Sequence, residues 1–145
     1  GRYTSVRPFD DYVHLAMGLP AGTCATSGSC GAYAVVEGDG SVYPCDFFAL
    51  DEWKLGNIHQ TPLAALSAGR REQEFLQEGL DHPAPCAACR WQALCQGGCK
   101  RDWTTGAQGG RQNYYCAAFQ KFFAHAEPRL RQIAAAEQRA RRMGL

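Results

Sequence analysis

The clearest pattern of apolar positions lies in the C-terminal part of the chain, after Cys116. Apolar residues recur there at steps of three and four positions, the spacing of one face of an α-helix: Phe119, Phe122, Phe123, Ala126, Leu130 and Ile133. Pro128 lies inside this stretch and should kink or restart the helix, because proline lacks a backbone N–H and clashes with the preceding turn. We therefore predict a C-terminal amphipathic helix, whose arginines we interpret as a solvated face.

The earlier part of the chain alternates short β-prone and short helical runs. The β-prone runs are Ala32–Glu37, Ser41–Asp46 and Leu55–Ile58. The first two flank Gly38-Asp39-Gly40, whose glycines permit the positive φ of a hairpin turn. Helices are predicted at Phe9–Met17, from Pro62 to Gly69 behind a Thr61 N-cap, and at Glu72–Leu80, with a loop of small residues between Cys24 and Cys30. Together these runs predict an α+β fold with a small β-hairpin.

Length, charge and composition exclude several classes of protein. The 145 residues fit one domain, at about 100–200 residues per domain. A net charge of +1 indicates neither a nucleic-acid-binding surface nor an acidic tail. No apolar run approaches the about 18 residues of a membrane span, and no secretory leader opens the chain. We expect no nucleic-acid partner and no membrane, and the first residue, Gly1 rather than Met, indicates a piece of a longer protein.

Eight cysteines carry the strongest chemical signal: Cys24, Cys30, Cys45, Cys86, Cys89, Cys95, Cys99 and Cys116. Four of them form the pattern Cys-x2-Cys-x5-Cys-x3-Cys. A two-residue gap lets both sulfurs turn toward one point, as tetrahedral zinc or the iron of a cluster demands. An even number of cysteines also fits a disulfide framework, but the crowded spacing and the missing leader favour metal.

Eight thiols are enough for two sites with four ligands each. In two-cluster ferredoxins the fourth cysteine of a dense run ligates the other cluster. By that logic Cys99 is the candidate ligand of the other site, and Cys116 would complete the site begun by Cys86, Cys89 and Cys95. Both zinc and iron–sulfur clusters accept four thiolates, and a set without histidine favours iron–sulfur while leaving zinc open. Gly97 and Gly98 should allow close backbone approach, with amides directed at sulfur.

Several strings of residues resemble the SPASM domain of anaerobic sulfatase-maturating enzymes. They are Gly38-Asp-Gly-Ser-Val-Tyr-Pro-Cys-Asp-Phe-Phe48, Lys54-Leu-Gly-Asn-Ile58, the run Cys86–Arg101 and Tyr114-Tyr-Cys116. The resemblance spans about Cys24 to Phe123 and includes all eight cysteines. It implies a SPASM-type fold, a hairpin and helices organised around two cysteine-ligated clusters. Residues 1–23 would then be the tail of a radical SAM partial barrel, 24–116 the SPASM domain and 117–145 a C-terminal helical segment.

The resemblance also implies cofactors and an activity. The first of two auxiliary [4Fe–4S] clusters would use Cys24, Cys30, Cys45 and Cys99, and the second Cys86, Cys89, Cys95 and Cys116. The full-length enzymes are radical SAM oxidoreductases that convert a cysteine or serine of an unfolded sulfatase polypeptide to Cα-formylglycine. A third [4Fe–4S] cluster and S-adenosylmethionine would belong to the partial barrel of the same chain. Asp46 matches the position proposed for the catalytic base, although an aspartate there also suits a turn.

One feature departs from the family. The radical SAM triad Cys-x3-Cys-x2-Cys is missing. The single x3 gap lies between Cys95 and Cys99, and Asp102 occupies the position that the third cysteine of the triad would take. We expect this chain alone to be inactive, and to expose apolar surface along the Phe119–Ile133 stripe or around Asp46. The alternatives are the SPASM domain of a radical SAM peptide-modifying maturase, and a zinc-stabilised structural or binding module with zinc in place of iron. Thiolate clusters favour a reducing, cytoplasmic location.

Overall fold

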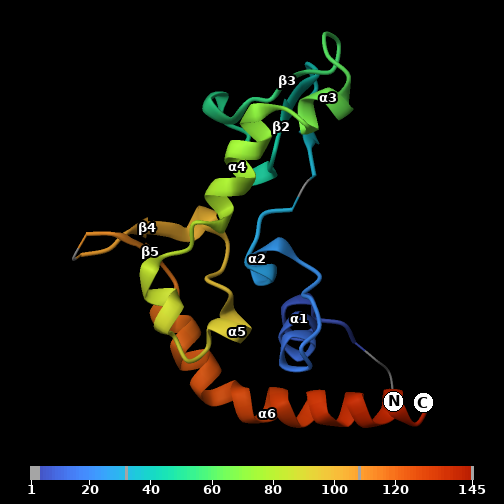
Figure 1. The fold of residues 1–145 in the computed structure, drawn as a ribbon, viewed down its shortest axis with the longest axis vertical. Helices are drawn as coiled ribbons and strands as arrows, with labels where there is room; N and C mark the ends of the chain where they lie inside the picture. The colour runs from blue at the N-terminus through green and yellow to red at the C-terminus, as the bar shows by residue number, and fades with distance from the viewer. Residues whose placement is uncertain (1–3, 32, 108, 145) are drawn as a thin grey trace. The chain divides into compact units, whose positions relative to one another are not determined.

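The structure is a computed structural model that describes residues 4–31, 33–107 and 109–144 (Figure 1). The chain divides into two compact units. Unit 1 comprises Gly1–Gly28 and His82–Leu145, and unit 2 comprises Ser29–Asp81. Among the described residues, no helix combines the length and the apolar composition needed to cross a membrane.

Unit 1 consists mainly of helices, with one small hairpin. Its elements are α1 (Arg7–Ala16), α2 (Cys24–Ser27), η3 (Ala84–Ala88), α5 (Gln92–Cys95), η4 (Lys100–Asp102), β4 (Trp103–Thr105), β5 (Arg111–Asn113) and α6 (Cys116–Arg142). Strands β4 and β5 pair antiparallel, with Trp103 opposite Asn113. The sequence analysis missed this hairpin, because its strands are polar and lack alternating apolar positions. The loop expected after Cys24 is instead one turn of helix.

The core of unit 1 forms where α1 and α5 pack against α6. Tyr12 meets Phe123 edge to face, with ring centroids 5.0 Å apart. Phe123 is 0% exposed and Leu130 is 6% exposed. The expectation that the Phe119–Ile133 stripe stays exposed is therefore wrong for these two residues, because α1 and α5 of the same unit cover them.

Helix α6 runs without interruption from Cys116 to Arg142. Figure 1 shows that it bends along its course. Pro128 lies within it, so the helix does not restart there, and the bend agrees with the expected effect of a proline inside a helix. The helix meets α1 on both sides of Pro128, through Phe123 before it and through Gln138, which donates to the Met17 carbonyl, after it.

Unit 2 holds the predicted hairpin and, paired with it, a third strand within the β-prone run Leu55–Ile58. Its elements are β1 (Val35–Val36), β2 (Ser41–Tyr43), η1 (Asp46–Phe48), η2 (Asp51–Trp53), β3 (Gly56–Asn57), α3 (Leu63–Ser67) and α4 (Arg70–Leu80). The strand order is β1-β2-β3, with both pairs antiparallel. Ala32, where the first strand was expected to begin, lies outside the described residues. The Thr61 cap is wrong, because α3 begins at Leu63 with Pro62 in the cap position.

Aromatic residues form the core of unit 2. Phe75 from α4 is 1% exposed. Its ring lies edge to face against Phe48, at 5.2 Å between centroids, and against Trp53, at 5.1 Å. The two short 3₁₀ turns that follow β2 are therefore fixed onto α4 by ring contacts. By contrast, Phe47 and Leu50 are about half exposed, so apolar surface does lie next to Asp46 as expected.

Candidate metal centre

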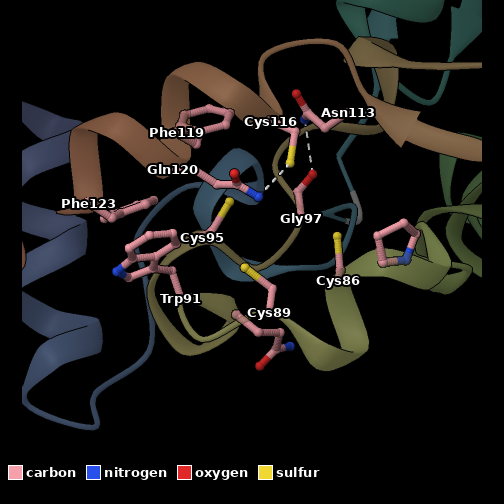
Figure 2. A pocket seen from close by; sticks show the side chains of 12 residues that line it. Cys86, Cys89, Trp91, Cys95, Gly97, Asn113, Cys116, Phe119, Gln120 and Phe123 are labelled. Atoms are coloured by element: carbon pink, nitrogen blue, oxygen red, sulfur yellow. Dashed lines mark hydrogen bonds between the residues drawn. The ribbon is translucent and has the colours of Figure 1, made fainter. Parts of the chain in front are cut away.

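Four of the eight thiols line one cavity in unit 1 (Figure 2). They belong to Cys86, Cys89, Cys95 and Cys116. Figure 2 shows their sulfur atoms arranged around the same space, with the rings of Trp91, Phe119 and Phe123 nearby. The cavity measures about 60 Å³, several times the about 10–15 Å³ that one water needs on the same measure. The structure therefore gathers the ligand set predicted for the second cluster.

Each thiol reaches the cavity from a turn or from the end of a helix. Cys86 and Cys89 flank one turn, in which the Cys89 N–H donates to the Cys86 carbonyl at 3.1 Å. Cys95 is the last residue of α5, and Gln96 then takes a left-handed φ of 52° that turns the chain. Cys116 is the first residue of α6, where unpaired N–H groups and the helix dipole favour an anionic group.

The predicted close approach of the Gly97–Gly98 backbone is confirmed. Gly97 has a φ of +80°, and a Cβ there would lie 2.7 Å from His82 Nδ1. The Gly97 carbonyl accepts hydrogen bonds from Trp103 Nε1 and from Asn113 Nδ2, both at 3.0 Å. These bonds hold the turn in a position where the Gly97 N–H acts to lower the pKa of the Cys95 thiol.

The electrostatics of the cavity oppose free thiolates. Burial, with a smaller contribution from the neighbouring thiols, raises the pKa of Cys95 to about 11, although the Gly97 N–H acts to lower it. Burial also raises the pKa of Cys86, with added repulsion from Cys116 and Cys89. Thiolates brought this close need a positive partner, and metal binding would displace their protons.

The cavity has room for a cluster of several atoms. Four thiolates around one zinc lie at about 2.3 Å from the metal, so their sulfurs are only about 4 Å apart. Among residues 4–31, 33–107 and 109–144, no group of three or more His, Cys, Asp or Glu side chains is gathered tightly enough for one ion. The four sulfurs surround a space instead, and a cluster of several atoms requires such an arrangement.

Cys24 and Cys99 both lie in unit 1. Burial raises the pKa of Cys99, and the Arg101 N–H opposes that rise. The Asp102 carboxylate and, after it, the Cys24 thiolate raise this pKa further by charge repulsion. Cys24 begins α2, while Cys99 immediately precedes η4.

A buried carboxylate secures the turn that carries Cys24. Asp11 in α1 is 3% exposed. It accepts hydrogen bonds at 2.7 Å from the Gly22 N–H and the Thr23 hydroxyl, and another from the Thr26 hydroxyl. Burial acts to raise the pKa of Asp11, but these hydrogen bonds outweigh burial and hold it below its ordinary value. The sequence analysis did not single out Asp11, because its partners lie 11 or more positions away.

Cys30 and Cys45 lie in unit 2. A Cβ on Gly79, inside α4, would lie only 2.6 Å from Cys30 Sγ, so a glycine is required there for the thiol to reach the helix backbone. Cys45 is buried, and its Sγ lies 3.4 Å from the Tyr33 hydroxyl. Because these two thiols belong to a different unit from Cys24 and Cys99, that set of four remains a prediction.

Asp46 is exposed and lies beside Cys45, at the start of η1. The Tyr33 hydroxyl donates a hydrogen bond to Asp46 Oδ1 at 2.9 Å. This bond, more than the contact with Cys45, lowers the pKa of Asp46, which is therefore ionised at neutral pH. Bonding to Cys45, burial and the Asp46 carboxylate raise the pKa of Tyr33.

Two polar side chains at these sites, Tyr33 and Gln120, were not predicted, although the spacing of residues along the chain could have identified each of them. Val35 pairs with Tyr43, and extending that register by two residues places Tyr33 opposite Cys45. Gln120 follows Cys116 by one helical turn, and its Nε2 donates to Cys116 Sγ at 3.6 Å.

The sequence of this chain matches a known domain family and a group of enzymes. Residues 28–90 match SPASM, an iron–sulfur cluster-binding domain. The chain is 37% identical over 135 residues to the cysteine-type anaerobic sulfatase-maturating enzyme of Clostridium perfringens (strain 13 / Type A), over 92% of this chain and 36% of that protein. It is 30% identical over 126 residues to the serine-type enzyme of Bacteroides thetaiotaomicron, over 85% of this chain and 30% of that protein.

The fold of this chain is also similar to that of a solved structure. The structure of native anSMEcpe with bound AdoMet and Cp18Cys peptide aligns at a TM-score of 0.82 and 37% identity, covering 92% of this chain and 37% of that one. This chain therefore spans about a third of the length of the curated relatives that it matches.

Proposed function

We propose that this chain, a SPASM-containing relative of the anaerobic sulfatase-maturating enzymes, is the auxiliary-cluster and substrate-docking part of a radical SAM oxidoreductase. The whole enzyme would convert a cysteine or serine of an unfolded sulfatase polypeptide to Cα-formylglycine. The observation that carries the proposal is the cavity in unit 1, which four thiols and an apolar wall surround. A reducing, cytoplasmic setting is part of the proposal, since exposed thiolates are otherwise oxidised.

The cysteines of this chain would hold two [4Fe–4S] clusters. The second cluster takes the four thiols of the cavity, where α6 adds the positive end of its dipole next to Cys116. The first takes Cys24, Cys30, Cys45 and Cys99, two from each unit. When bound, such clusters supply one-electron transfer. The apolar rings around the cavity would limit the access of water to the ligand sulfurs, which are partly buried.

Asp46 is the residue proposed to accept a proton from the substrate thiol or hydroxyl. Its carboxylate is exposed and ionised at neutral pH, so it can receive a proton without first losing one. Tyr33 donates to one carboxylate oxygen and restricts the orientation of the carboxylate. The exposed side chains of Phe47 and Leu50 offer apolar surface for a polypeptide next to this carboxylate.

The first experiment is the measurement of iron, zinc and acid-labile sulfide in this chain purified without oxygen and reconstituted with iron and sulfide. We expect about eight iron and about eight sulfide per chain, with the brown absorbance of [4Fe–4S] clusters. About two zinc per chain, with no sulfide after reconstitution, would overturn the proposal in favour of a zinc-stabilised structural module.

The substrate class needs a separate assay on the whole enzyme that contains this chain. The sulfatase proposal expects turnover of a sulfatase-motif peptide, and Asp46→Asn should reduce that turnover while leaving the iron content unchanged. Turnover of a different ribosomally made precursor peptide, with none of the sulfatase peptide, would instead identify a peptide-modifying maturase.

A further inference from the structure

One side-chain amide in the cavity points at a ligand sulfur. Gln120 Nε2 lies 3.6 Å from Cys116 Sγ, within the distance of an N–H···S hydrogen bond (Figure 2). The residues are four positions apart on α6, so one turn of helix brings their side chains together. Long side chains on a helix lean toward its N-terminus, which directs the Gln120 amide back to the first residue of α6.

The other amide side chains that line the cavity are bonded elsewhere. Asn113 Nδ2 donates to the Gly97 carbonyl at 3.0 Å, and Gln92 Nε2 reaches the Gln96 side chain at 3.5 Å. These residues form part of the wall of the cavity, whereas the Gln120 amide donates a hydrogen bond to a cysteine sulfur. The rest of the wall is largely apolar, so few other polar groups compete for that sulfur, although Gln120 itself is exposed.

We propose that the Gln120 amide raises the reduction potential of the cluster held by Cys86, Cys89, Cys95 and Cys116. This inference rests on the proposed function, since it requires that cluster. Reduction adds one electron to the cluster with no change in its ligands, and the added charge spreads onto the cysteine sulfurs. An N–H donor to a sulfur stabilises the more negative, reduced form, so the bond favours reduction. Gln120 thus acts through Cys116 as a tuning and positioning residue.

The test replaces Gln120 with a side chain of similar length that has no N–H. Gln120→Met removes the donor and adds no charge. Gln92→Met makes the same change on the same wall, where the amide does not contact sulfur in this structure. Both variants and the parent chain are reconstituted without oxygen and titrated with dithionite, the midpoint of each cluster being followed by electron paramagnetic resonance.

We expect one of the two midpoints to become more negative in Gln120→Met, by about a tenfold change in the ratio of oxidised to reduced cluster, which is about 59 mV for one electron. The other midpoint, and both midpoints of Gln92→Met, should not move. Unchanged midpoints in Gln120→Met at full iron content, or equal shifts in both variants, would overturn the inference. A parent chain that binds no cluster would instead overturn the proposed function.

A second measurement covers the case in which Gln120→Met loses iron. The parent chain is labelled with ¹⁵N in its glutamine side chains, reduced, and measured by pulsed electron paramagnetic resonance. A ¹⁵N coupling to the reduced cluster that persists in Gln92→Met supports the bond to Cys116. The absence of any such coupling in the loaded parent chain contradicts it.

Discussion

The two units of this protein hold their cysteines in different ways. Unit 1 places four thiols around one cavity, using the ends of η3, α5 and the beginning of α6. Unit 2 holds two, Cys30 against Gly79 in α4 and Cys45 beside Tyr33 and Asp46. A ligand set contained in one unit can assemble when that unit folds. The set proposed for the other cluster takes two thiols from each unit, so it requires both units to fold.

The largest effect is expected from the loss of a ligand in either set. Cys95→Ala should reduce iron and sulfide from about eight to about four per chain, because a cluster with three cysteines is not retained. Cys45→Ala should cause an equal loss while leaving the cavity thiols intact. The iron and sulfide content of the two single variants and of the double variant measures how many clusters each one retains. If the double variant keeps about four iron, the assignment of ligands to two separate sets is wrong.

Replacing a core aromatic residue should show whether the units are stable independently. Phe123→Ala and Phe75→Ala each remove a side chain that is at most 1% exposed, one in each unit. Each should lower the free energy of unfolding by about 3–5 kcal/mol. Hydrogen exchange during denaturant titration should locate the loss in unit 1 for Phe123→Ala and in unit 2 for Phe75→Ala. Equal losses in both units from either variant would mean that the units unfold together.

Asp11 should make unit 1 sensitive to acid. Its folded pKa lies below its ordinary value, so the stabilisation is present above about pH 4 and is lost as the pH falls through the folded pKa. Asp11→Asn should cost about 1–3 kcal/mol at neutral pH and should flatten the loss of stability in acid. Asp51→Asn, on an exposed turn of unit 2, is the control and should change stability by less than about 0.5 kcal/mol. Parallel acid dependence in the parent and Asp11→Asn would refute this role.

The smallest effect is expected at the surface of unit 2. Arg70 pairs with Glu74 at 3.2 Å across one turn of α4, but its side chain is 89% exposed. Arg70→Ala should change the free energy of unfolding by less than about 0.5 kcal/mol, because solvent screens the pair. Thermal unfolding in low and high salt measures this, with Phe75→Ala as the reference for a core change. A loss comparable with that of Phe75→Ala would show that the pair is part of a larger network.

The sequence predicted local features well wherever neighbours along the chain determine them. The hairpin around Gly38–Gly40, the strand near Gly56 and the helix after Cys116 depend on turn residues and on apolar spacing, and all three are present. The polar hairpin of β4 and β5 escaped prediction, because its packing against the cysteine turn, and not an apolar pattern, holds it in place. The stripe on α6 was predicted correctly as a helix face, but α1 covers much of it.

The spacing of residues along the chain was enough to predict a metal-binding chemistry. Eight cysteines at these spacings predict thiolate ligands for metal, and Gly97 and Gly98 predict a backbone that approaches sulfur, because short spacings restrict local geometry. The spacing made Cys116 a candidate for the site of Cys86, and the folded chain brings both thiols to one cavity. That arrangement depends on how α6 packs beside α5 and η3. Packing between segments 20 or more residues apart follows from the combined shape of many side chains, which no single spacing records.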